Sequence, residues 1–273
     1  MLRIEQLTLE LPYYPRWWQR RFATHLDQLS FRAMAGSLHA VVGASGAGKS
    51  LLAHTIMGLL PADARLSGQC FYQEMLLDAK RQRHLRGRHL ALIPQSLNAL
   101  DPLVRTQRQV SWAANRAGLG QKAAWQAAGQ ALDHYQLNDR AGRAYPHELS
   151  GGMARRVLTA MAHVGQASLI IADEPTVGLD PAQRDRVLSA LRSLTHQGKA
   201  VILITHDLRH VLPIADHVTI MHQGRSVETA PANAFTGMGE TLKSAYAQAL
   251  WQALPDNAFS TSEILHKKEE SVA

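Results

Sequence analysis

GASGAGKS, residues 43–50, follows the apolar stretch HAVV and precedes the helical pattern SLLAHTIMGLL. Its three glycines let the backbone turn tightly, so that successive N–H groups and the positive end of the following helix face a phosphate. The Lys49 ammonium can reach the β- and γ-phosphate oxygens of a nucleotide, and the Ser50 hydroxyl can ligate Mg²⁺. Eight positions between a strand and a helix therefore predict a phosphate loop. The predicted contacts are Gly43, Ala44, Ser45, Gly46, Ala47, Gly48, Lys49 and Ser50.

Apolar strands alternate with helices towards the C-terminus. The strand-like pieces are short and nearly all apolar, which is typical of a parallel sheet that is covered by helices on both faces. The predicted order is helix 150–166, strand 168–173, helix 181–196, strand 200–206, helix 207–214 and strand 217–224. The sequence therefore predicts an α/β fold around a parallel sheet.

The N-terminal part is rich in strand patterns instead. Residues 1–42 alternate like strands, interrupted by the aromatic and basic insertion PYYPRWWQRR at residues 12–21, and residues 62–93 hold short strand-like pieces. The basic run KRQRHLRGRHL, residues 80–90, is interpreted as a solvated face that leads into a strand, because no aromatic residues are interleaved with it. These segments predict an antiparallel β subdomain at the N-terminus.

The pattern divides the chain into three parts. Residues 96–148 are rich in Ala and Gln at helical spacing and predict an inserted helical subdomain, because the α/β pattern resumes after them. Residues 1–95 and 149–231 then form the core. Residues 232–273 form a C-terminal extension with one helical stretch, TLKSAYAQALWQAL, and a polar end, HKKEESVA, that we expect to be disordered.

Polar side chains end several of the predicted strands, where ligands gather in a parallel sheet. SLIIADE (168–174) delivers two carboxylates: we expect Asp173 to hold the Mg²⁺ shell, and Glu174 to point elsewhere and orient or deprotonate an attacking water. LITHD places His206 at the end of the next strand, within reach of a γ-phosphate, and LIPQ places Gln95 where it can sense Mg²⁺ or water.

LSGGM, residues 149–153, offers a second anion cradle. A helix that starts at Ser150 directs its N–H groups and positive end outward, and Gly151 and Gly152 allow close approach of a ligand to the backbone. A chain with one phosphate loop thus carries a second feature suited to phosphate.

Composition narrows the function classes. Because Cys70 is the single cysteine, an internal disulfide and any multi-cysteine metal site are excluded, and the 14 histidines are interpreted as individual surface or core residues. The net charge of +7 suits an anionic partner, which could be nucleic acid, a lipid headgroup surface or a nucleotide. The longest apolar stretch, 157–172, is interrupted by His163 and Gln166, so we expect no membrane span; no secretory signal is visible, and we expect the chain to stay in the cytoplasm.

Together these motifs resemble the ATP-binding subunit of ABC transporters over roughly residues 1–230. The resemblance rests on GASGAGKS, Gln95, LSGGM, LIIADEP, VGLD and ITHD in this order and spacing. It implies an ABC ATPase (P-loop NTPase) core that binds ATP and Mg²⁺, with Gly43–Ser50 as Walker A, Gln95 as the Q-loop, Asp173 and Glu174 as Walker B, Asp180 as the D-loop and His206 as the switch histidine. Met153 departs from the Gln of many members, and we expect altered tuning without loss of activity.

The resemblance also implies partners. In this family two ATPase domains pack head to tail, so that the signature at Ser150–Gly152 caps the γ-phosphate on the other domain's Walker A loop. Importers of the peptide and nickel uptake subfamily, which LIPQSLNALDPLVRTQRQV and AYAQALWQALPDNAF resemble, commonly pair two unlike ATPase chains with two membrane permease subunits and an extracytoplasmic solute-binding protein. The chain would then lie peripherally at the cytoplasmic face of the bacterial inner membrane, energising uptake of an oligopeptide, nickel or a metal chelate.

Two questions stay open at the level of sequence. A soluble ABC ATPase that acts on nucleic acid or ribosomes is the alternative suggested by the net charge, although long coiled-coil heptads and a second ATPase unit are not seen and no nucleic-acid partner is expected. The family stacks adenine on an aromatic residue near the N-terminus; Tyr13 or Tyr14 is preferred among the candidates Tyr13, Tyr14, Trp17, Trp18 and Phe22.

Overall fold

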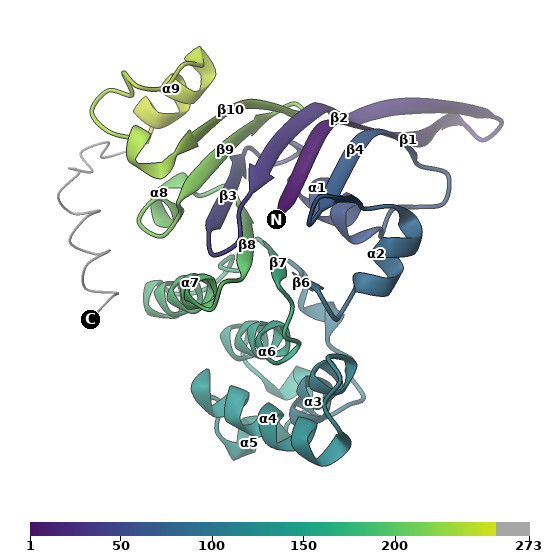
Figure 1. The fold of residues 1–273 in the computed structure, drawn as a ribbon, viewed down its shortest axis with the longest axis vertical. Coiled ribbons are helices and arrows are strands. Elements are labelled where there is room, and N and C mark those ends of the chain that lie inside the picture. The colour runs from purple at the N-terminus through teal and green to yellow at the C-terminus, as the bar shows by residue number, and fades with distance from the viewer. Residues whose placement is uncertain (255–273) are drawn as a thin grey trace.

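A computed structural model describes residues 1–254 of the 273-residue chain. An antiparallel sheet, a central sheet and a group of helices follow one another from the top to the bottom of Figure 1. The polar end HKKEESVA lies outside the described residues. None of the helices in residues 1–254 combines the length and the apolar character that a bilayer crossing requires.

The central sheet has six strands in the order β10-β9-β3-β8-β7-β6. All neighbours are parallel except β10, which pairs antiparallel with β9 and continues the sheet past the last strand expected from the sequence. The strands are β3 (Leu38–Gly43), β6 (Leu90–Ile93), β7 (Leu169–Asp173), β8 (Ala200–Thr205), β9 (His217–His222) and β10 (Arg225–Pro231). The predicted parallel sheet is confirmed.

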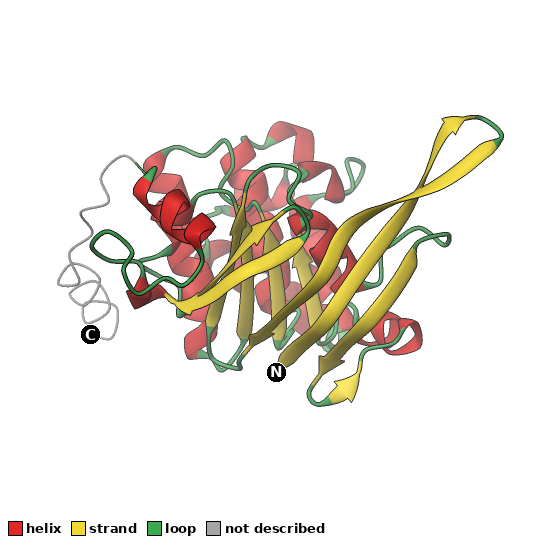
Figure 2. Ribbon diagram, turned by 90° about the horizontal axis from the view of Figure 1, so that it is seen from above, coloured by secondary structure: helices red, strands yellow, loops and turns green. Residues whose placement is uncertain are grey.

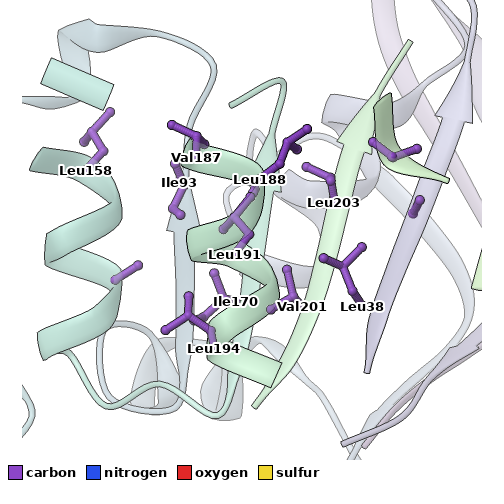
Figure 3. Close-up of a cluster of buried hydrophobic side chains, with 14 of the residues drawn as sticks. Leu38, Ile93, Leu158, Ile170, Val187, Leu188, Leu191, Leu194, Val201 and Leu203 are labelled. Carbon is purple, nitrogen blue, oxygen red and sulfur yellow. The ribbon is translucent and has the colours of Figure 1, made fainter. Parts of the chain in front are cut away.

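Both faces of this sheet are apolar. Along β8, Val201 and Leu203 belong to the core beneath helix α7 (Pro181–His196), whereas Ile202 and Ile204 belong to the core beneath the antiparallel sheet. Figure 3 shows the first of these cores, in which leucines of α7 lie over side chains of the strands. Because both faces of the sheet are covered, the strands are continuous apolar runs without alternating polar residues.

The antiparallel sheet has the order β2-β1-β4-β5 and covers the other face together with helix α1. Its strands are β1 (Leu2–Arg16), β2 (Gln19–Ala33), β4 (Arg65–Tyr72) and β5 (Met75–Leu76), and α1 spans Lys49–Met57. The predicted β subdomain is confirmed. The aromatic and basic insertion does not separate two strands, however: β1 and β2 pair continuously to Arg16 and Gln19, so the insertion is the outer end of one long hairpin.

The basic run at residues 80–90 is mostly exposed or half-buried and leads into β6 at Leu90, as the sequence predicts, and its first part is helical. Helix α2 (Ala79–Leu85) begins at Asp78, whose carboxylate accepts a hydrogen bond from the Arg81 amide at 2.7 Å. Its buried Gln82 donates to the carbonyls of Thr55 and Ile56 at 2.7 and 3.2 Å, at the end of α1. The N-cap and the buried Gln82 side chain thus stabilise a helix in a segment whose charged residues show no helical periodicity.

The inserted region is helical, as the sequence predicts. It contains η1 (Leu97–Ala99), α3 (Thr106–Arg116), α4 (Gln121–His134), α5 (Asp139–Arg143) and η2 (Pro146–Glu148), and it packs on α6 (Gly151–Val164), which returns the chain to the core. Figure 1 places α3, α4 and α5 at the end of the molecule opposite to the antiparallel sheet. The remaining helices are α8 (Leu208–Val211), η3 (Ala232–Ala234) and α9 (Ala245–Gln252), the last within the helical stretch expected in the C-terminal extension.

Candidate nucleotide-binding site

The phosphate loop joins β3 to α1 in a backbone path that side chains would obstruct. A Cβ on Gly43 would lie 2.4 Å from the Met221 carbonyl oxygen, and one on Gly48 would lie 2.8 Å from the His25 carbonyl oxygen. Gly48 also has a φ of +93°, the left-handed region that favours glycine. The glycines are therefore required by the neighbouring strands and by the turn itself.

Lys49 begins α1 and points back into the loop. Its Nζ donates to the carbonyls of Gly43 at 2.7 Å and Ala44 at 3.0 Å, and the residue is only 7% exposed. Burial lowers the pKa of Lys49, while the carboxylates of Glu174 and Asp173 raise it. The ammonium thus lies between the loop and two acids, where a phosphate can exchange for the carbonyl contacts.

Asp173 ends β7 and has one unsatisfied oxygen. Its Oδ1 is buried without a hydrogen-bond partner in the described part of the chain. Burial raises the pKa of Asp173, a hydrogen bond from Ser50 lowers it and neighbouring Glu174 raises it again. A buried carboxylate oxygen beside a serine hydroxyl is the donor set that Mg²⁺ prefers, so these residues fit the metal that the sequence predicts.

Glu174 is turned back towards the same site. Its φ is +47°, which breaks the strand alternation, and its amide donates to the Ile204 carbonyl at 2.9 Å. Its carboxylate accepts hydrogen bonds from His206 Nδ1 at 2.9 Å and Thr205 Oγ1 at 3.2 Å, and lies 4.0 Å from Lys49 Nζ. Asp173 and Glu174 thus have different hydrogen-bond partners, in keeping with the expectation that Glu174 points elsewhere, and both carboxylates raise the pKa of Lys49.

Two residues that fix Glu174 were not singled out by sequence. Thr205 donates to its carboxylate, and buried Arg155 on α6 donates to its backbone carbonyl at 3.2 Å. Thr205 is the residue before His206, so its position at the end of a predicted strand could have marked it as a candidate site residue. Arg155 lies three residues after Gly152 and four before Thr159, on the buried face of α6, which charge alone does not reveal.

The other predicted residues are placed around this cluster. Gln95 is exposed just beyond β6, the strand beside β7. Asp180 accepts a hydrogen bond from the Gln183 amide at 2.8 Å and caps α7. Ser150 accepts from the Met153 amide at 3.2 Å and caps α6, and both Ser150 and Gly151 are exposed. Gly152 is buried instead, since its Cβ would meet Gln183 Oε1 at 1.6 Å, so this glycine serves the contact of α6 with α7.

The aromatic candidates for adenine lie on the β1–β2 hairpin. Tyr13, Tyr14, Trp17 and Trp18 are exposed, and Phe22 is half-buried under the Arg65 guanidinium, 3.6 Å from its ring centroid. The part of β2 that approaches the phosphate loop is at His25 and Leu26 instead. The choice of an adenine-stacking residue stays a prediction.

Comparison with known proteins identifies the family of this chain. Residues 26–177, more than half of the chain, match the ABC transporter family. The oligopeptide transport ATP-binding protein OppD of Salmonella typhimurium is 35% identical over 217 residues, which cover 77% of this chain and 65% of the relative. The dipeptide transport ATP-binding protein DppD of Escherichia coli K12 is 34% identical over 245 residues, which cover 85% of this chain and 73% of the relative.

A solved structure agrees with the fold. It is described as the dimeric, post-hydrolysis state of an ATP-binding cassette bound to ADP and Pi; its TM-score is 0.74 at 21% identity, over 85% of this chain and 99% of that chain. The chain spans just under two thirds, 65%, of the length of the Salmonella relative. The family match nevertheless spans the phosphate loop and both carboxylates, and the chain belongs to the ABC transporter family, of which it carries the ATP-binding domain.

Proposed function

We propose that this chain binds and hydrolyses ATP with Mg²⁺ as the energising subunit of an ABC importer for peptides. The observation that carries the proposal is the convergence of Lys49, Asp173, Glu174 and His206 at the carboxyl ends of three neighbouring strands, β3, β8 and β7. One cation, two acids and an imidazole are suited to phosphoryl transfer, which needs positioning and charge neutralisation more than covalent help.

Each residue has a distinct part in this proposal. The phosphate loop and Lys49 bind the β- and γ-phosphates, and Ser50, Asp173 and Gln95 hold Mg²⁺, which neutralises developing charge on the phosphate oxygens when bound. Glu174 orients the attacking water and accepts its proton. Thr205, His206 and Arg155 keep the Glu174 carboxylate and backbone in place, because each donates a hydrogen bond to it. His206 is more than half exposed, so it can also face the γ-phosphate.

The second phosphate cradle is proposed to serve another chain. Ser150 and Gly151 are exposed at the start of α6, where free backbone N–H groups can receive an anion. A similar fold is described as a dimer with bound nucleotide products, which supports head-to-tail pairing in which each signature closes on the partner's ATP. ATP then favours the closed pair, because it contacts both chains only in that state.

The membrane partners are proposed to dock on the helical insertion. Leu103 is 84% exposed there, and Trp112 and Trp125 are exposed on α3 and α4. Exposed large apolar side chains gathered on one subdomain mark a protein contact. The relatives named for oligopeptide and dipeptide transport support peptide as the cargo. The proposed partners are two permeases, a binding protein and a second ATPase chain. The chain would lie peripherally at the cytoplasmic face of the inner membrane; nickel and metal chelates remain cargo predictions without support from these relatives.

Co-purification tests the proposal. The tagged full chain, extracted from its own membranes in detergent, should bring down integral membrane subunits, and the purified assembly should hydrolyse ATP faster when the peptide-loaded binding protein is added. Leu103→Glu should weaken this association at least about tenfold, since it removes an apolar contact that the permease would bury in the proposed interface. Leu66→Glu is the matched control, because Leu66 is 50% exposed on β4, outside the helical insertion. Recovery of nucleic acid without any membrane subunit would contradict the proposal and favour the nucleic-acid alternative.

A further inference from the structure

The hairpin tip, residues 12–21, lies beyond the part of β2 that approaches the phosphate loop, which is at His25 and Leu26. β4 pairs with β1 from Leu2 to Glu10, so beyond Glu10 the only strand within residues 1–254 that pairs with β1 is β2. The free ribbon continues for six residues to Arg16, about 20 Å at ~3.3 Å per residue. Figure 2 shows this ribbon extending away from the rest of the molecule. No residue from 11 to 22 is buried.

Large aromatic side chains occupy this tip. Trp17 and Trp18 form the turn and are 86% and 64% exposed, and Tyr13 and Tyr14 are 44% and 56% exposed. The two tryptophan rings stand nearly perpendicular, at 88°. Four such rings on a projecting ribbon are an exposed apolar patch of the kind that marks an interaction site.

The tip is also strongly basic. Arg16, Arg20 and Arg21 lie within it, and residues 11–22 contain no Asp or Glu. Arg20, next to the last pair before the turn, is paired at 3.3 Å with Asp63, and Arg65 lies 3.6 Å from the Phe22 ring, so one side of the ribbon is fastened to the body. Arg16, beside the turn, and Arg21, opposite Tyr13, are exposed and carry their charge beside the exposed rings. The ribbon is therefore held on one side while these charges and the rings face solvent.

The mixture of side chains favours one kind of partner. Tyr and Trp, with an apolar ring and a polar atom, prefer the boundary between lipid tails and water, and Arg is attracted to anionic headgroups. Tyr13 and Tyr14 are adjacent on a strand and so project from opposite faces of the ribbon. A rigid protein pocket would have to enclose both faces of a convex tip, whereas a headgroup layer surrounds it from all sides. Nucleic-acid stacking needs a groove, and a two-residue turn provides none.

We propose that the hairpin tip inserts into the headgroup layer of a bilayer rich in anionic lipid. The contact goes beyond the proposed transport function, because it needs neither nucleotide nor permease. It would give the chain a second, weak attachment to the membrane surface besides any attachment through partner subunits.

Vesicle sedimentation with the full chain alone tests this contact. The wild type should pellet with vesicles of equal parts phosphatidylglycerol and phosphatidylcholine and remain in solution with phosphatidylcholine alone. Binding should weaken as salt is raised, since the headgroup attraction is screened. The tryptophan emission should shift to the blue only with the anionic vesicles, because the indole rings leave water.

Paired variants separate the tip from other exposed groups. Trp17→Ala with Trp18→Ala should weaken anionic vesicle binding by at least about tenfold and abolish the blue shift, and Arg16→Gln with Arg21→Gln should weaken it by a similar factor. Leu76→Ala, which removes a 49% exposed apolar side chain on β5, should bind like the wild type. Circular dichroism with melting curves confirms that each variant is folded.

Several outcomes would overturn the proposal. Equal sedimentation with both vesicle types would show that charge has no part in it, and folded tip variants that bind anionic vesicles like the wild type would show that the tip is not the contact. Loss of permease co-purification in the tip variants with unchanged vesicle binding would make the tip a protein contact instead. None of these results depends on ATP turnover, so they are distinct from a failure of the proposed transport function.

Discussion

At the scale of single residues, Asp173 and Glu174 are adjacent carboxylates with different surroundings. Glu174 accepts hydrogen bonds from Thr205 and His206, whereas Asp173 Oδ1 is buried without a partner in residues 1–254. A carboxylate with fixed donors has a defined position, which suits a group that handles water. One with an unsatisfied oxygen has room for a cation.

Replacing Asp173 should separate stability from function. Burial raises the pKa of Asp173 above its value in the unfolded chain, so the carboxyl stabilises the fold while it is protonated. This stability is lost as pH rises from the unfolded pKa through the folded pKa, because the buried carboxyl then becomes charged. Asp173→Asn should therefore raise the melting temperature of the nucleotide-free protein by roughly 2–4 °C, for about 1 kcal/mol. It should also abolish the additional stabilisation that Mg²⁺ gives to the ATP complex.

Thermal melts with and without ATP and Mg²⁺ measure both effects. Asp185→Asn, on the exposed surface of α7, is the control and should change neither quantity. A lower melting temperature for Asp173→Asn together with an unchanged Mg²⁺ effect would contradict the assignment.

Glu174→Gln should keep ATP binding and lose hydrolysis. The amide preserves the size of the side chain and one acceptor for His206, but it cannot take a proton from water. We expect the dissociation constant for ATP to change by less than about threefold and the turnover of the assembled complex to fall by about 10²-fold or more. Equilibrium binding and phosphate release measure the two, and an undiminished turnover would remove Glu174 from the proposed role.

His39 should make the protein sensitive to acid. It is buried in β3 with Nε2 2.7 Å from Thr219 Oγ1, and desolvation by burial, aided by His217, lowers its pKa to about 4. A histidine with a lowered native pKa stabilises the fold above its unfolded pKa of 6.5, and this contribution is lost as pH falls towards 4. The expected loss is up to about 3 kcal/mol between pH 7 and pH 4.

Denaturant unfolding at the two pH values measures this loss. His39→Gln keeps a donor towards Thr219 without a titrating ring, so it should lose about 3 kcal/mol less than the wild type over the same range. Identical losses in the two proteins would show that His39 is not the group responsible.

At the scale of elements, local signals explain which parts could be predicted. Helix α7 begins and ends where the sequence predicts, because Asp180 is an N-cap, Pro181 suits the first turn and leucines recur at helical spacing. The buried strands were found from their apolar runs. The site residues at strand ends followed from the phosphate loop and the sheet edge together.

The missed elements depend on contacts distant in sequence. Helix α2 is fixed through Gln82 to carbonyls of α1, and the long hairpin through cross-strand pairs and arginine contacts to Phe22. The turn at Glu174 and the hydrogen bond from Arg155 belong to the same class, because a left-handed φ in Glu and a buried Arg have no local sequence signature. Such features need the fold before they can be recognised.

The contact between α2 and α1 supplies a prediction at this scale. Gln82→Ala would leave the Thr55 and Ile56 carbonyls at the end of α1 without this donor in a buried place, so we expect a loss of about 1–3 kcal/mol of unfolding free energy. Arg83→Ala, one position along on the exposed side of α2, should change it by less than about 0.5 kcal/mol. Urea titration compares them, and equal losses would contradict the contact.

At the scale of the whole molecule, the phosphate loop and the start of α6 belong to different parts of the chain. The phosphate loop, Asp173 and Glu174 lie at one edge of the central sheet, and the exposed start of α6 at Ser150 points its backbone amides outward. In the proposed function one chain supplies a binding loop and a separate cap. Head-to-tail pairing then requires that the cap of one chain closes the loop of another around ATP.

The most direct test of this requirement is the turnover of ATP per chain. It is measured while the concentrations of the chain and of a second ATPase subunit are varied over about a thousandfold range. Pairing predicts that turnover per chain is low at high dilution and rises to a plateau as pairs form, because each complete site needs two polypeptides. Full turnover at the lowest concentration, with no response to a second subunit, would contradict it.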